Sequence, residues 1–249
     1  MTFIYPTETF DHQGKTILIP VVSTANVGQL AVDLIIASLA LERIAIFAPE
    51  YCVPVVGARE GGRPGITTPL ELYGSADASF VVVQQRSPVL KAKKQEYTDA
   101  LFTFIKASKF GAVLFISGMD LLNRTDAQMM TATYQLVPPN APSLESSPLK
   151  TLLTLPIPVY TSPTDARSAL PTIPGGGLTR RLLASVPPGW AIPTASILQF
   201  VLEGDNRADA GFLASVVTKV VGVDVAQWRQ PGSWTDGLFG TPHDQTLYG

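Results

Sequence analysis

Hydrophobic and polar residues are arranged along this chain in blocks that predict strands and helices in turn. An almost unbroken apolar run at residues 16–22 predicts a buried strand. Residues 26–41 are expected to form a helix, with Asn26 as its N-cap and Gln29 completing a capping box. One face of that helix collects Val27, Leu30, Ala31, Leu34, Ile35 and Ser38. A strand followed by a helix is typical of a mostly parallel sheet covered by helices.

The alternation continues through the first half of the chain. The expected elements are a strand at 43–48, an edge segment at 53–56, a hairpin formed by 71–73 and 79–85, a helix at 91–109 and a buried strand at 112–117. A Gly- and Pro-rich loop is expected at 57–69. We therefore predict an α/β domain.

The second half of the chain is less regular. Many Pro and Ser residues at 138–163 predict a long irregular connection with one short strand near 152–160. Helices are expected at 178–183, at 194–203 and from Asn206 onward, the last ending at Gly222 as a C-cap. No internal repeat interrupts this order. We predict a single domain over residues 1–240 and a tail over 241–249.

Composition narrows the possible functions. Of 249 residues, 46% are hydrophobic and only 15% are charged, and the formal net charge is −2. Charged residues make up about a quarter of an average chain, so this one is expected to fold and to keep apolar surface for a partner. The weak net charge argues against nucleic acid or a membrane surface as the main partner. We also expect no membrane-spanning segment and no signal peptide, and hence a location in the cytoplasm or the nucleus.

Two glycine-rich segments resemble anion-binding loops. The spacing at 57–62 is that of a phosphate loop, but Arg63-Pro64 stands where a lysine and a hydroxyl residue are needed. Gly175-Gly176-Gly177 precedes a helix and could approach an anion there, although a tight, closely packed turn is the simpler interpretation. The sequence therefore predicts no cofactor.

Residues suited to catalysis are few. Ser23 and Ser117 follow strands, but neither lies in the G-x-S-x-G frame of a nucleophile elbow. His12 and His243 stand near the two ends of the chain, and Cys52 is the only cysteine. A Ser-His-Asp triad or a transition-metal site is therefore not expected.

An enzyme remains the rival interpretation. It would need a pocket with converging polar groups near Ser23, Asn26 and Ser117. Asp33 and Asp120 could pair as acid and base, but nothing in their spacing indicates it, and positions on a helix surface and in a turn are the simpler interpretation.

The chain ends on a short pattern that suits docking into a pocket. Leu247, Tyr248 and Gly249 fit the motif hydrophobic-Tyr-any residue, with which proteasome activators and some assembly factors bind between proteasome alpha subunits. Leu247 would be an apolar anchor, Tyr248 would supply a ring and a hydroxyl, and the carboxylate of Gly249 could pair with a lysine. An ordinary frayed terminus is the alternative.

Several segments together resemble the proteasome assembly chaperone 2 family. They are residues 19–36, 53–57, 84–87, 173–179, 200–206 and Trp234 with 238–240. The strand-turn-helix segment 19–36 is the most specific of these, whereas residues 120–170 match poorly.

The resemblance implies a fold and a function. The fold is a three-layer α/β domain, distantly like that of nucleoside phosphorylases. The function is that of a non-enzymatic subunit that pairs with proteasome assembly chaperone 1 and holds the outer face of the 20S alpha ring during assembly. The tail at Leu247, Tyr248 and Gly249 would then bind the ring, as in fungal members. A subunit that binds only its partner chaperone and leaves the ring to it is a further possibility.

Overall fold

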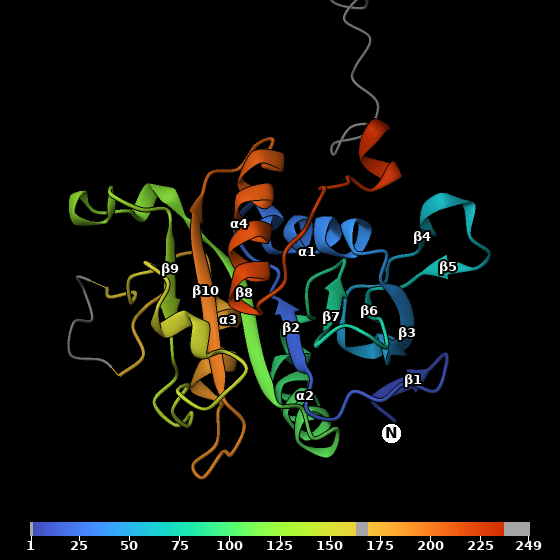
Figure 1. Cartoon of the computed structure of the whole chain (residues 1–249), viewed down its shortest axis with the longest axis horizontal. Helices are drawn as coiled ribbons and strands as arrows, with labels where there is room; N and C mark the ends of the chain where they lie inside the picture. Colours follow the sequence, from blue (N-terminus) through green and yellow to red (C-terminus); the bar gives the residue numbers. More distant parts are fainter. Residues whose placement is uncertain (1, 163–168, 237–249) are drawn as a thin grey trace, which may run out of the picture.

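The computed structural model describes residues 2–162 and 169–236, and in them eight strands form one mixed sheet. The strands are β1 (Ile4–Pro6), β2 (Thr16–Pro20), β3 (Glu42–Phe47), β6 (Leu70–Gly74), β7 (Phe80–Gln85), β8 (Ala112–Asp120), β9 (Thr133–Leu136) and β10 (Thr194–Val201). Their spatial order is β1-β3-β6-β7-β2-β8-β10-β9 (Figure 1). The central strands β7, β2, β8 and β10 run parallel, and the outer pairs are antiparallel. Two short strands, β4 (Gly57–Ala58) and β5 (Ile66–Thr67), form a separate ribbon inside the predicted loop.

Helices cover both faces of this sheet. They are α1 (Val27–Ser38), α2 (Lys94–Ala107), α3 (Gly177–Ala184) and α4 (Arg207–Val220). The helices α1 and α4 pack against each other and against one face, while α2 and α3 lie on the opposite face (Figure 1). The predicted three-layer α/β class is thereby confirmed, with the parallel strands confined to the centre.

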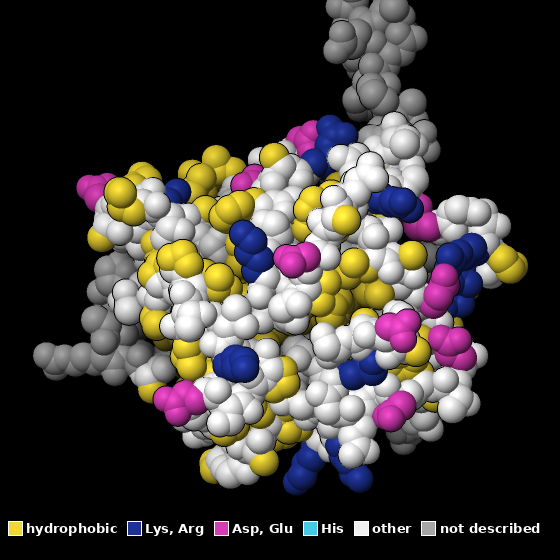
Figure 2. Space-filling view, in the orientation of Figure 1, with side chains coloured by type: hydrophobic (Ala, Val, Ile, Leu, Met, Phe, Trp, Pro, Cys, Tyr) yellow, Lys and Arg dark blue, Asp and Glu magenta, His cyan; other side chains and the backbone are white. Residues whose placement is uncertain are grey.

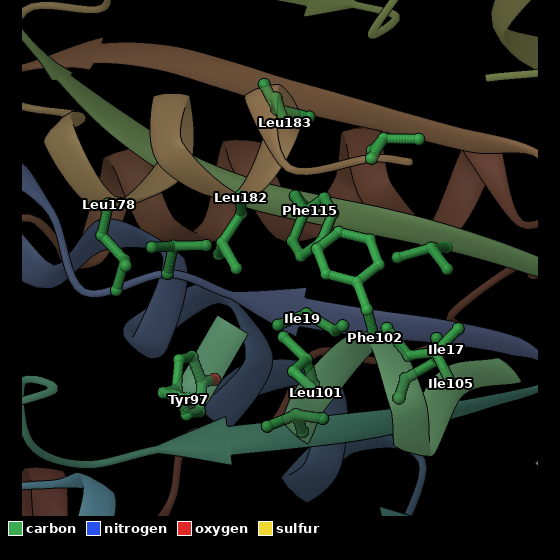
Figure 3. Close-up of a cluster of buried hydrophobic side chains, with 14 of the residues drawn as sticks. Ile17, Ile19, Tyr97, Leu101, Phe102, Ile105, Phe115, Leu178, Leu182 and Leu183 are labelled. Carbon is green, nitrogen blue, oxygen red and sulfur yellow. The ribbon is translucent and has the colours of Figure 1, made fainter. Parts of the chain in front are cut away.

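The two cores follow from the alternation of side chains along the strands. In β2, Ile17 and Ile19 point into the core under α2 and α3, whereas Leu18 points into the core under α1 and α4. Figure 3 shows Ile17, Ile19 and Phe115 packed against side chains of α2 and α3. Such strands are buried on both faces, which explains their nearly continuous apolar sequences.

The helix predicted at residues 194–203 is wrong, because residues 194–201 form the strand β10, next to the edge strand β9. All eight of its residues are buried, and it pairs with β8 on one side and β9 on the other. Its polar residues Ser196 and Gln199 are three positions apart, a spacing that also suits the exposed face of a helix. Gln199 is instead buried, with its amide Nε2 3.0 Å from the carbonyl oxygen of Asp209 and its Oε1 3.3 Å from Thr133 Oγ1.

The strand predicted near residues 152–160 is also wrong. That segment holds a 3₁₀ turn at Lys150–Leu153 and contributes only an isolated bridge between Val159 and Gln135. The edge strands β1 and β9 were not predicted, because three or four residues are too few to show a clear alternation.

Two of the predicted helix caps have different outcomes. Asn26 precedes α1 but has a left-handed backbone, and its side chain makes no capping hydrogen bond, so the capping box with Gln29 is wrong. The C-cap of α4 is Val221, and the predicted Gly222 is the next residue, at the left-handed C′ position. The φ of Gly222 is 71°, its N–H donates to Lys219 O, and the N–H of Val223 donates to Thr218 O, as in a Schellman motif.

Candidate functional site

The carboxyl ends of the four parallel strands β7, β2, β8 and β10 meet at one edge of the sheet, where the loops that follow them lie together. This edge is at the top of Figure 1, under α1. In α/β sheets, binding residues are commonly carried by these loops. A catalytic site formed by Ser23, Asn26 or Ser117 would therefore lie at this edge.

The two serines of the enzyme hypothesis form hydrogen bonds that link neighbouring segments of the chain. Ser23 Oγ donates to Val21 O at 2.9 Å and accepts the N–H of Gly118 at 2.8 Å. Ser117 is fully buried, donates to Gly118 O and accepts from Thr179 Oγ1 at 2.7 Å. Neither hydroxyl therefore faces a base that could activate it.

The other candidate catalytic residues do not converge. His12 packs against Phe110, with ring centroids 5.1 Å apart, whereas His243 lies outside the described residues. Asp120 caps a 3₁₀ turn by accepting from the N–H of Leu122. Cys52 is buried, which raises the pKa of its thiol to about 11. In the part of the chain that the structure describes, no group of three His, Cys, Asp or Glu side chains could hold a metal ion.

The turn at Gly175-Gly176-Gly177 is confirmed as a tight one. Gly175 has a φ of 72°, and a Cβ added there would overlap Thr24 Oγ1 in the loop after β2. Gly175 thus lets the start of α3 approach the β2–α1 turn. That close packing accounts for glycine at position 175.

A polar pocket of about 250 Å³ opens between the end of β7 and the start of α1. It is lined by Val22, Asn26, Gln29, Asp33, Gln84, Gln85, Arg86, Ser87 and Pro88. The enzyme interpretation expected a polar pocket near Asn26, Ser23 and Ser117, but of these three only Asn26 lines this pocket, and residues 84–88 were not expected in it. The signal that could have found it is the set of polar residues directly after two adjacent parallel strands.

Asp33 is the acidic group of the polar pocket. Its Oδ1 accepts from Gln84 Nε2 and lies 3.7 Å from Arg86 Nη2. Burial raises the pKa of Asp33 from 3.8 to about 6, against the opposing effects of Arg86 and Gln84. The carboxyl is thus mostly ionised at neutral pH but poorly solvated.

The predicted binding residues Leu247, Tyr248 and Gly249 lie outside the described residues. The described segment at 229–234, which precedes them, is attached to the domain. Trp234 is buried in the core that contains α1. The N–H of Arg229 donates to Ser38 Oγ at 2.8 Å, and the N–H of Ser233 donates to Glu60 Oε2 at 3.2 Å. Residues 229–234 are therefore fixed to the C-terminal end of α1 and to the β4–β5 ribbon.

Exposed apolar side chains gather after β8 and β10. Leu122 is 82% exposed and Met130 is 92% exposed, and Met129 lies between them in the β8–β9 connection. Leu202, after β10, lines the same shallow hollow as Leu122. Figure 2 shows hydrophobic side chains at the upper left, where Figure 1 places this connection. We call Leu122, Met129, Met130 and Leu202 the apolar patch.

Comparison with known proteins gives the same family as the sequence motifs. The family model described as PAC2 family matches residues 17–221. This range includes the strands from β2 to β10 and the helices α1 to α4, and it leaves out β1 and the residues after α4. The chain belongs to the PAC2 family. Within the described residues, none of its helices is long and apolar enough to cross a membrane.

Curated relatives match nearly end to end. Proteasome assembly chaperone 2 of Xenopus tropicalis is 31% identical over 244 residues, covering 91% of this chain and 92% of the relative. The human protein of the same name is 30% identical over 262 residues, covering 96% of each.

Solved structures show the same fold at low identity. Pyrococcus furiosus PbaA, an archaeal homolog of proteasome-assembly chaperone, has a TM-score of 0.66 at 17% identity, covering 90% of this chain and 88% of its own. Pyrococcus furiosus PbaB, an archaeal proteasome activator, has a TM-score of 0.60 at 17% identity, with coverages of 90% and 91%. The PAC2-family fold is therefore kept where little sequence is shared.

Proposed function

We propose that this chain is a proteasome assembly chaperone subunit and has the same function as the relatives named proteasome assembly chaperone 2. The observation that carries the proposal is similarity at about 30% identity over more than nine tenths of both chains. The absence of a catalytic arrangement around Ser23 and Ser117 in the described residues fits a protein that acts by binding. The subunit would pair with proteasome assembly chaperone 1 and hold the outer face of the 20S alpha ring.

The tail would make the contact with the ring. Thirteen residues follow Asp236 in the sequence, a length that spans at most about 45 Å when fully extended. Because residues 229–234 are fixed to α1 and the β4–β5 ribbon, the tail starts from a defined point of the domain. Leu247 and Tyr248 would enter a pocket between alpha subunits, and the Gly249 carboxylate would pair with a lysine there.

Deleting Leu247, Tyr248 and Gly249 is expected to weaken binding to purified alpha rings by at least about tenfold, because the anchors of the contact are lost. The fold and the pairing with the partner chaperone should be unchanged, since the deleted residues follow the buried Trp234 by more than ten positions. Affinity measured with immobilised alpha rings checks the first point, and gel filtration of the heterodimer checks the second.

The matched control replaces Gln245 and Thr246 by alanine, which changes the tail but leaves its last three residues intact. This variant should bind as the unaltered protein does. Equal binding of the truncated chain would show that the ring is held by another surface.

The apolar patch is the proposed contact with the partner chaperone. Its side chains are far more exposed than is usual for leucine and methionine, and methionine adapts readily to a partner surface. Leu122→Asp is therefore expected to weaken heterodimer formation by at least about a hundredfold.

Leu153→Asp provides the comparison, because Leu153 is also an exposed leucine in a 3₁₀ turn but lies outside the apolar patch. Heterodimer formation by co-expression and analytical ultracentrifugation should fail for the Leu122 variant alone. If both variants pair normally, the heterodimer forms through a different face.

A further inference from the structure

The polar pocket lies at a topological switch point of the sheet. The strands β2 and β7 are parallel neighbours, but β2 leads into α1 on one face and β7 leads into α2 on the other. Their connections therefore separate and leave a crevice at the carboxyl edge, where ligands of α/β proteins bind. Asn26 comes from the first connection and residues 84–88 from the end of the second strand.

Buried amide groups in this pocket have no hydrogen-bond partner among the described residues. Gln29 is only 8% exposed, and both its Nε2 and its Oε1 are unpaired. The Oε1 of Gln84 is also buried and unpaired, while its Nε2 donates to Asp33 and to the backbone oxygen of Gln29 at 3.3 Å. Native proteins rarely leave such groups unpaired, because burial removes the water that would bind them.

The backbone beside these groups is also strained. Ala25 and Asn26 have φ values of 57° and 51°, in the left-handed region that residues other than glycine seldom adopt. The N–H of Ala25 donates to Glu203 Oε1 at 2.9 Å, which helps to hold this turn. The strained turn places Asn26 on the wall of the pocket.

The two charged side chains that line the pocket, Asp33 and Arg86, have opposite signs. Asp33 and Arg86 form an ion pair at 3.7 Å, and Glu60 on the neighbouring ribbon is close enough to act on Asp33 as well. A ligand with a net charge would be attracted by one of these two groups and repelled by the other, so it would lose its hydration without gaining a net counter-charge. An uncharged ligand avoids that repulsion.

The unpaired atoms set the chemistry of such a ligand. Gln29 Nε2 needs an acceptor, whereas Gln29 Oε1 and Gln84 Oε1 need donors. A planar group with a carbonyl next to an N–H satisfies both needs at once. We propose that the polar pocket binds a small uncharged molecule through a carboxamide or lactam edge, with Gln29 and Gln84 as its hydrogen-bonding partners. This site is separate from the tail and from the apolar patch, so it does not depend on the proposed function.

Three probes of one shape and different charge test the proposal on the full chain: benzamide, benzoate and benzamidinium. Binding is followed by amide chemical shifts in ¹⁵N-labelled protein. Benzamide is expected to bind in the millimolar range and to shift the signals of residues 26–33 and 84–88, with the two charged probes at least about tenfold weaker. Equal binding of all three, stronger binding of a charged probe, or no benzamide binding at about 10 mM would overturn the proposal.

Substitution of Gln29 separates a binding role from a structural one. Gln29→Met removes the unpaired amide at nearly constant length, so benzamide affinity should fall at least about tenfold while the melting temperature stays equal or rises. Gln95→Met is the control, because Gln95 is exposed on α2, away from the pocket, and should leave benzamide binding unchanged. Unchanged benzamide affinity in the Gln29 variant, or a clear fall in its melting temperature, would contradict the assignment.

Discussion

Replacing Arg43 by methionine is expected to lower the free energy of unfolding by about 3–5 kcal/mol. Arg43 on β3 is the cation paired with Glu71 on β6, with Nη1 and Oε1 2.7 Å apart. Glu71 is completely buried, and its other hydrogen bonds come from neutral groups: the N–H and the hydroxyl of Thr68 and the hydroxyl of Tyr73. Without Arg43, the carboxylate loses its direct counter-charge in a site that water does not reach. Urea unfolding at neutral pH measures the change.

A second arginine pair gives the control for this prediction. Arg63 pairs with Glu42, but both side chains are about half exposed to solvent. Arg63→Met should therefore change the free energy of unfolding by less than about 1 kcal/mol. The double variant Arg43→Met, Glu71→Gln should regain much of the lost stability, since no charge is then left buried. Similar small losses for both single variants would show that Glu71 does not need its partner.

Asp33→Asn is expected to raise the free energy of unfolding above neutral pH by up to about 3 kcal/mol. Burial raises the pKa of Asp33 from 3.8 to about 6 in the folded protein, so the folded state favours the protonated form. The resulting stabilisation is fully present below pH 3.8 and is lost as the pH rises through about 6. An asparagine at this position stays neutral, so the variant keeps this stabilisation at high pH. Partial exposure of the Asp33 side chain makes the stated value an upper limit.

The measurement compares the two proteins by urea unfolding between pH 4 and pH 8. The difference in stability should be small at pH 4, grow through pH 5 and 6, and stay constant above pH 7. Taking the difference cancels the titration of all other groups. A native protein that gains stability relative to the variant over this range would mean that Arg86 and Gln84 outweigh burial.

The elements predicted correctly share a local signal. The strand at 16–22, the helix beginning at Asn26 and the helix ending at Gly222 each carry their hydrophobic period and their boundary residues within about 20 positions. The prediction for residues 194–203 was wrong because the polar residues of β10 are hydrogen-bonded to residues far away in the sequence. Gln199 bonds to residues 133 and 209, and only these partners make its burial possible.

The polar pocket could not be located from the sequence for a related reason. Gln84 contacts Asp33 and Gln29, which precede it by 51 and 55 positions. No short-range pattern links these residues. Gln29 fits a capping box equally well, and that was the interpretation its spacing suggested. Gln29 instead lines the pocket with its amide buried and unpaired, and the pocket exists because β2 and β7 pair in parallel.

The sequence by itself determined the α/β class, the family and the residues of the C-terminal motif. These depend on local periods, on motifs such as 19–36 and on the identity of Leu247, Tyr248 and Gly249, all of which can be read along the chain. Only the tertiary structure decided which side chains share a site. The pairing of β7 with β2 and the opposite placement of α1 and α2 bring Gln29, Asp33 and Gln84 together and bury the two glutamines. Burial and proximity of that kind are properties of the folded chain, because they arise from contacts between residues far apart in the sequence.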